Sequence, residues 1–295
     1  MAGAVELHAH LQSGATTVCN AWLVTRADGV RFGFTDHDRD LAFDGQTFKA
    51  SSGLSAGTLQ QTTGMSVDNS EALGALSAAS VSEADLAAGR FDGAEVQSWL
   101  VNWADLDQRI VQFRGNFGEV TRKAGSFRVE LRGLSERLNL AQGRAYHPGC
   151  SAVLGDAACG VDMNLPGNFA EAAIAGFDGL GRIILNGLAG YGDRWFERGT
   201  VRALSGAAAG LISAVKTDRL TLTGREIELW HGFGAAIAVG DVLRLQVGCD
   251  KRAETCRTKF ANFLNFRGFH HIPGEDWLAS YPVSSGLNDG GSLSQ

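Results

Sequence analysis

The sequence predicts a mainly β protein with two β-barrel-like or sandwich-like domains and few short helices. Glycine accounts for 39 of the 295 residues and proline for only 4, a balance that favours tight turns and short strands. Runs of alternating apolar and polar residues recur between Gly and Asp turns, which is typical of barrels and sandwiches. A chain of this length is expected to hold two domains. We place them at residues 1–145 and 146–283, before a tail at 284–295 that we expect to be flexible.

The first half contains clear turn and cap signals. Residues 21–50 are predicted to form hairpins that turn at Asp28-Gly29 and Asp44-Gly45, because Asp-Gly between alternating runs favours a tight turn. A short helix is expected to begin after Ser82, whose side chain can cap it, and to stop at Gly89. The remaining alternating segments of this half predict strands, at 95–103 and within 109–134.

The second half repeats the same pattern after residue 150. Short β-type segments with Gly and Asp turns follow one another, at 169–188, 195–206, 211–224, 226–232 and 241–249. Helical spacing returns only at 256–266, where Phe260, Phe263 and Leu264 are predicted to share one face of a helix.

Charge and hydropathy exclude two classes of partner. The chain has 26 Lys and Arg against 32 Asp and Glu, whereas a general nucleic-acid binder needs an excess of basic residues. The longest apolar stretch, residues 206–215, is much shorter than the ~20 residues that span a bilayer, so we expect no membrane insertion.

The first residues lack the features of a signal peptide. His8 and His10, in the same segment, are predicted to face one side of a strand.

Four of the five cysteines form two pairs at the ends of the second β region. Cys150 and Cys159 enclose eight residues, and Cys249 and Cys256 enclose six. In a reducing cytosol such thiols are expected to bind metal, and four thiolates suit either structural zinc or an iron–sulfur cluster. The gaps are wider than those of zinc knuckles, and buried thiols without a ligand or two local disulfides are the alternatives. Cys19 is interpreted as a strand residue outside this set.

Basic residues crowd the second cysteine pair. Their charge and any N–H···S bonds would offset the negative charge of a thiolate site, although ordinary surface solvation explains them equally well. The residues concerned are Lys251, Arg252, Arg257 and Lys259.

Catalytic motifs are missing from the sequence. It has no nucleophile elbow, zinc-protease motif or phosphate loop, and Cys19 with His37 is the one candidate nucleophile pair. The acidic run Thr35–Asp40 is interpreted as a polar turn, while His147 is a minor candidate for a metal ligand or a donor to sulfur. We therefore predict that the chain is not an enzyme.

The segment GCDKRAETCRTKFANFLNFRGFHHIPGED, from Gly248 to Asp276, resembles the C-terminal signature of a family of phage tail-tip (baseplate) hub proteins. Members of this family occur in prophages and in the gene transfer agents of alphaproteobacteria. The segments FTDHDRDL, LAAGRFDGAEVQSWLVNW and GEVTRKAGSFRVELRGL extend the resemblance to the first half. The cysteine region is also similar to the minor tail protein L of phage lambda.

The resemblance implies a structural virion protein whose second domain is tied by a 4Fe-4S cluster. The cluster ligands, carried over by position, are Cys150, Cys159, Cys249 and Cys256. Residues 1–145 would form a ring, expected to be a homotrimer, below the distal tail protein, while residues 146–283 would clamp the central tail-tip or fibre protein.

A tail peptidase is a further expected partner, and DNA would only pass through the channel. The particle would be assembled in the bacterial cytoplasm. The alternatives are a zinc-binding structural protein and a metal-dependent tail-associated enzyme such as a cell-wall hydrolase.

Overall fold

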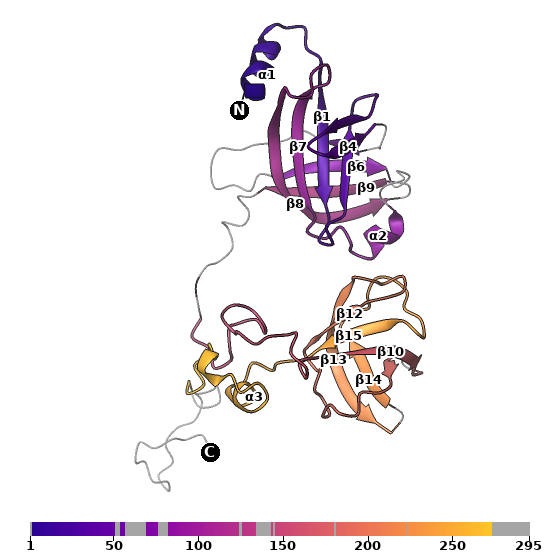
Figure 1. The fold of residues 1–295 in the computed structure, drawn as a ribbon, viewed down its shortest axis with the longest axis vertical. Coiled ribbons are helices and arrows are strands. Elements are labelled where there is room, and N and C mark those ends of the chain that lie inside the picture. The colour runs from indigo at the N-terminus through magenta and orange to yellow at the C-terminus, as the bar shows by residue number, and fades with distance from the viewer. Residues whose placement is uncertain are drawn as a thin grey trace. The chain divides into compact units, whose positions relative to one another are not determined.

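The computed structural model describes residues 2–50, 54–56, 69–75, 82–123, 126–133, 143, 145–179, 181–222 and 224–272. The chain divides into two compact units, Met1–Ala141 and Gln142–Gln295, and each is described by itself. Strands dominate both units (Figure 1), which confirms the prediction of a mainly β chain with few short helices. The tail predicted at 284–295 lies outside the described residues.

The first unit is built on one nine-stranded sheet. Its strand order is β3-β4-β2-β1-β7-β8-β9-β6-β5, so the barrel-like or sandwich-like domain expected here is wrong, and the unit has one open sheet instead. The elements are α1 Ala2–Gln12, β1 Val18–Thr25, β2 Arg31–Thr35, β3 Leu41–Phe43, β4 Gln46–Lys49, β5 Leu54–Ala56, β6 Asn69–Ala75, α2 Glu83–Ala87, β7 Glu95–Asn102, β8 Arg109–Lys123 and β9 Ser126–Gly133.

Both faces of this sheet bury apolar side chains. Alternate residues of β1 point to opposite faces, so Trp22 and Val24 join one core while Ala21 and Leu23 join the other. The α2 helix adds Leu86 to the first core, and the β3–β4 hairpin adds Phe43 and Phe48 to the second. A single sheet therefore supports two cores, which explains why its strands looked like those of a sandwich.

The predicted turns and cap of the first unit are confirmed. Strands β1 and β2 pair antiparallel across Asp28-Gly29, and β3 pairs with β4 across Asp44-Gly45. Asp44 and Gly45 both have positive φ, 49° and 70°, as a tight two-residue hairpin turn requires. The hydroxyl of Ser82 accepts the Asp85 N–H at 3.0 Å and caps α2.

The strand predicted to carry His8 and His10 is wrong, because these residues lie in helix α1. The helix-favouring Ala, Leu and Glu residues of this segment outweigh the spacing of the two histidines. Leu7 is only 1% exposed, and the His10 ring accepts the Thr17 N–H at 3.0 Å. The bond between His10 and Thr17 ties the helix to the residue before β1.

The second unit contains a closed six-stranded barrel of order β10-β11-β14-β13-β12-β15. This confirms the barrel predicted for this part of the chain, with every predicted β segment present. The strands are β10 Phe169–Phe177, β11 Ile183–Leu185, β12 Thr200–Ala203, β13 Ile212–Thr221, β14 Gly224–Leu229 and β15 Val242–Gln246. Ile174, Leu185, Val215, Leu243 and Leu245 fill its interior.

A second part of this unit, residues 145–168 and 248–272, has little regular structure, and we call it the cysteine arm. It contains the helix α3 Ala253–Thr258 and the short 3-10 helix η2 Phe263–Asn265. The continuous helical face predicted for Phe260, Phe263 and Leu264 is wrong. The helix ends at Thr258, Ala261 takes a left-handed conformation, and Leu264 is 96% exposed.

Within the described part of the chain, no helix combines the length and the apolar character needed to cross a membrane.

Candidate metal centre

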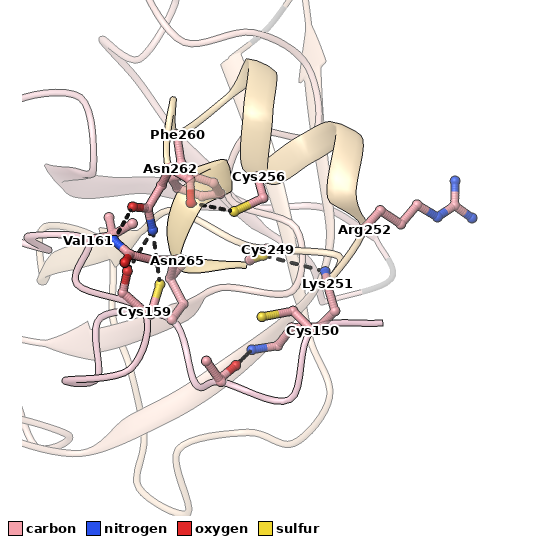
Figure 2. Close-up of a pocket in the computed structure, with 12 residues that line it drawn as sticks. Cys150, Cys159, Val161, Cys249, Lys251, Arg252, Cys256, Phe260, Asn262 and Asn265 are labelled. Carbon is pink, nitrogen blue, oxygen red and sulfur yellow. Dashed lines mark hydrogen bonds between the residues drawn. The ribbon is translucent and has the colours of Figure 1, made fainter. Parts of the chain in front are cut away.

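The four paired cysteines line one small cavity in the cysteine arm. Cys150 and Cys159 come from its first segment, Cys249 follows strand β15, and Cys256 lies in α3. Figure 2 shows all four sulfur atoms turned toward the same space. The fold thus closes a loop of about a hundred residues and brings together thiols from both ends of the barrel segment.

Main-chain contacts hold the two segments of the arm against each other. The N–H of Cys150 donates to Lys251 O at 2.8 Å, and the N–H of Ser151 donates to Arg267 O at 3.4 Å. The N–H of Phe269 donates to His147 O at 2.9 Å. Each bond joins a backbone group of one segment to a backbone group of the other, so the two segments form one hydrogen-bonded substructure.

The arm is also tied to the barrel next to Cys249. Gly248 lies so close to Glu197 O that a Cβ atom would clash with that oxygen, which explains why a glycine precedes the cysteine. The Lys259 ammonium donates to Trp195 O at 2.7 Å and to Gly248 O at 2.9 Å, and lies 4.6 Å from the centre of the Trp195 ring. Lys259 therefore fastens the end of α3 to the strand that leads into Cys249.

Three N–H groups donate hydrogen bonds to sulfur atoms of the set. The Lys251 N–H lies 3.4 Å from Cys249 Sγ, the Arg267 N–H lies 3.4 Å from Cys150 Sγ, and Asn262 Nδ2 lies 3.8 Å from Cys159 Sγ. Such donors stabilise negative charge on thiolate ligands. Three of the four sulfurs thus accept a hydrogen bond of the kind found at metal–thiolate sites, whereas the Cys256 thiol itself donates to Asn262 O.

Two of the four thiols, Cys249 and Cys256, have a pKa above that of a free cysteine. Burial raises the pKa of Cys249, and the N–H and charge of Lys251 offset only part of that rise. Burial also raises the pKa of Cys256, as does the negative charge that the other three thiols would carry. Metal binding to such thiols displaces protons, so affinity increases with pH.

The donor set fits a metal–thiolate centre, while the space between the sulfurs is narrow. The cavity has a volume of about 20 Å³, and one water needs ~10–15 Å³. Among the residues that the structure describes, no three His, Cys, Asp or Glu side chains are arranged to hold a single metal ion. Sulfurs around one zinc would lie about 3.8 Å apart, given Zn–S bonds of ~2.3 Å. A metal centre therefore requires a local shift of the loops that carry the thiols.

The four basic residues predicted to balance the thiolate charge each contact a different partner. Lys251 contributes the N–H to Cys249, and its ammonium donates to Ala152 O on the opposite wall. Arg252 lies at the rim with its side chain 81% exposed. Arg257 stacks over Phe263 at 4.3 Å, and Lys259 is held by the barrel as described above. Direct donation to sulfur thus comes from one of the four predicted cations.

Three residues near the sulfurs were missed by the sequence reasoning. They are Asn262 and Arg267, which donate to sulfur, and Asp156. The Asp156 carboxylate accepts the N–H of Cys159 at 2.6 Å and that of Val153 at 2.9 Å, and these bonds lower its pKa. An Asp three residues before a Cys in a Gly-containing loop is a turn signal that could have found Asp156.

The other candidates from the sequence lie away from this cavity. His147 Nδ1 accepts the Gly149 N–H at 2.9 Å, so its ring closes its own turn. Cys19 is buried in β1 with Sγ 3.7 Å from Val101 O, and the His37 ring packs against Trp103. These different neighbours do not favour a nucleophile–base pair.

The acidic run Thr35–Asp40 forms the polar turn that we predicted. Asp36 accepts the N–H of Asn20, and Asp40 accepts the N–H of Ala50.

Comparison with known families identifies the chain. Residues 4–162 match the family model described as baseplate hub protein, N-terminal attachment domain. The chain belongs to this baseplate hub family. Residues 194–276 match a second model, described as phage conserved hypothetical protein BR0599. The first cysteine pair lies in the first matched region and the second pair in the other.

A solved structure agrees with this assignment. The chain is 58% identical to a chain from the virion of a native gene transfer agent particle, with a TM-score of 0.88. The match covers 97% of this chain and 99% of that chain. No curated protein matches the chain. The predicted resemblance to hub proteins of phages and gene transfer agents is confirmed.

Proposed function

We propose that this hub protein is a structural subunit at the tail tip (baseplate) of a gene transfer agent or phage particle, with a 4Fe-4S cluster bound by Cys150, Cys159, Cys249 and Cys256. The cluster would staple the cysteine arm. Family membership and the 58% identity to a chain of a gene transfer agent virion support the location. The four thiols around one cavity support the staple.

The observation that carries the staple is the lack of an apolar core in the cysteine arm. Among the described residues of the arm, the buried apolar side chains are Ala152 and Cys256. Small structural units without a core depend on disulfides, metals or oligomerisation. The cysteines of the arm are free thiols and not disulfides. A metal bound by the four cysteines could therefore stabilise the arm from within.

We favour a cluster over a single zinc ion at this site. Four separate irons accept one thiolate each, so the ligand sulfurs of a cluster lie farther apart than those around one ion. The described sulfurs do not form a set that fits one ion, and the cavity of about 20 Å³ between them would widen to hold a cluster. Zinc remains the alternative that metal analysis would distinguish.

The assembly that we propose is a ring of identical subunits, specifically a trimer. The N-terminal unit would form the ring under the distal tail protein, and the C-terminal unit would bind the central tip protein, with a tail peptidase as a further neighbour. DNA would pass through the channel, and the net charge of -6 would limit its adhesion. Sedimentation of the purified chain tests the ring: a threefold mass supports it and a monomer at assembly concentrations contradicts it.

A structural role is favoured over an enzymatic one. The baseplate hub family is structural, and the candidate pair Cys19 and His37 has the separate neighbours described above. Cells producing particles with Cys249→Ser provide the test, with Cys19→Ala as the matched control. We expect particles without complete tails from the first variant and normal tails from the second. Normal tails and lost cell-wall digestion in Cys249→Ser would instead indicate an enzyme.

A further inference from the structure

Asn262 connects the two cysteine pairs through a compact set of hydrogen bonds. Its side-chain Nδ2 donates to Cys159 O at 2.6 Å and lies 3.8 Å from Cys159 Sγ. Its main-chain N–H donates to Cys256 O at 2.9 Å, and its main-chain O accepts the Cys256 thiol at 3.3 Å. Figure 2 shows this asparagine between the two cysteines. One residue thus contacts a cysteine from each end of the barrel segment.

The orientation of the Asn262 amide is fixed by a second asparagine. Asn265 Nδ2 donates to Asn262 Oδ1 at 2.7 Å, so the oxygen is occupied and the NH₂ group faces Cys159. Asn265 also lies close to Gly160, whose added Cβ would approach Asn265 Nδ2 to 3.3 Å. The pair is therefore packed against the loop that carries Cys159.

A strained backbone conformation at Ala261 directs Asn262 toward the two cysteines. Ala261 has a φ of 47°, a left-handed conformation that is unfavourable for a residue with a side chain. This turn follows α3 and brings Asn262 back over Cys256. Strain of this kind persists where surrounding contacts determine the conformation, and here those contacts are the bonds to the two cysteines.

We propose that Asn262 is a positioning residue for the metal centre: its main-chain N–H holds Cys256 through the carbonyl oxygen, and its amide holds Cys159 and stabilises negative charge on the Cys159 sulfur. The bond from the Cys256 thiol to Asn262 O is lost when that thiol gives up its proton to bind metal. The inference rests on the proposed iron–sulfur centre. An N–H donor to a ligand sulfur raises the reduction potential of a cluster, and outer hydrogen bonds of this kind also increase metal affinity. The potential is a property that a merely structural asparagine would not change.

The test compares three variants of the full-length chain, each purified anaerobically. Asn262→Ala removes the amide, and Asn262→Asp keeps its size but replaces the donor with a carboxylate. Asn168→Ala is the matched control, because the Asn168 amide donates to Asp162 O within the same arm at 2.8 Å. The readouts are the iron content per chain and the reduction potential measured by voltammetry.

We expect Asn262→Ala to shift the potential to a more negative value and Asn262→Asp to shift it further, because the carboxylate adds negative charge. Asn168→Ala should keep the original potential. Loss of iron from both Asn262 variants, with iron kept by Asn168→Ala, would also support the inference. Full iron at an unchanged potential in both Asn262 variants overturns it. An unmodified chain without iron would contradict the proposed function instead.

Discussion

The barrel and the cysteine arm belong to one unit, but different interactions stabilise them. The barrel closes its sheet, which leaves no edge strand, and fills its interior with branched and aromatic side chains. The arm buries Ala152 and Cys256 and otherwise depends on hydrogen bonds between its two segments. The arm therefore lacks the apolar core that stabilises the barrel, and we propose that four metal-bound thiols stabilise the arm instead.

The barrel also contains a charged anchor for the loop that meets the arm. Asp218 and Arg225 are fully buried, with Arg225 Nη1 2.6 Å and 2.7 Å from the two carboxylate oxygens. Asp218 accepts the Phe196 N–H, and Arg225 donates to Tyr191 O and Gly192 O. This pair holds the loop on which Trp195 meets Lys259, so the barrel core supports the position of Cys249.

Replacing one of the four cysteines should have the largest effect. We expect Cys249→Ser to reduce iron from about four atoms per chain to nearly none and to disorder the arm, because hydroxyl oxygen is a poor ligand for iron in a cluster. Iron and sulfide analysis together with limited proteolysis checks this. Cys19→Ala, which removes a thiol from the sheet core, should keep its iron, and equal iron in both variants would refute the ligand assignment.

Removing the metal from the intact chain should separate the arm from the barrel. After treatment with an iron chelator, amide protons that the arm protects, such as those of Cys159 and Cys256, should exchange roughly tenfold faster or more. Amides of paired strands β13 and β14 should keep their protection, since the barrel has its own core. Hydrogen exchange with mass spectrometry measures both regions at once. Unchanged exchange in the arm would mean that metal does not stabilise it.

The buried ion pair of the barrel should matter more than an exposed one between the same strands. Arg225→Met leaves the Asp218 carboxylate buried without its partner, which costs about 3–5 kcal/mol. Lys216→Met breaks the partly exposed bridge to Glu228, which is worth at most ~1 kcal/mol. Denaturant unfolding of the two variants compares these costs. Equal destabilisation would show that the buried pair is not an anchor.

The smallest expected effect concerns the reactivity of the thiols in the chain without metal. Burial raises the pKa of Cys19 to about 11, so at pH 8 only about one molecule in a thousand carries the reactive thiolate. Iodoacetamide at pH 8 should therefore label Cys150 and Cys159, which are half-buried, well before Cys19. Peptide mapping by mass spectrometry identifies the labelled residues, and early labelling of Cys19 would contradict its place in the sheet core.

Much of the fold could be predicted from local sequence patterns. The Asp-Gly turns, the Ser82 cap and the barrel strands depend on neighbouring residues, so short-range rules found them. The helix at residues 2–12 was missed because two histidines at alternate positions resembled a strand pattern. The end of α3 was missed because the left-handed turn at Ala261 depends on contacts with distant residues.

In the candidate site, too, residues with a local sequence signal could be predicted, and residues placed by long-range contacts could not. The four cysteines could be selected because their residue type and pairing carry chemical meaning, and the structure places them around one cavity. Asn262 and Arg267 could not be selected, because their partners Cys159 and Cys150 lie more than a hundred residues away in the chain. Hydrogen bonds over that distance are set by the closed barrel between the segments, and no local pattern records them.

The most direct test of the central claim is analysis of iron and acid-labile sulfide in the anaerobically purified chain. The account predicts about four irons and four sulfides per chain, a brown colour, and loss of both elements in the Cys249→Ser variant. Zinc with no sulfide, or four reactive thiols without any metal, would contradict it.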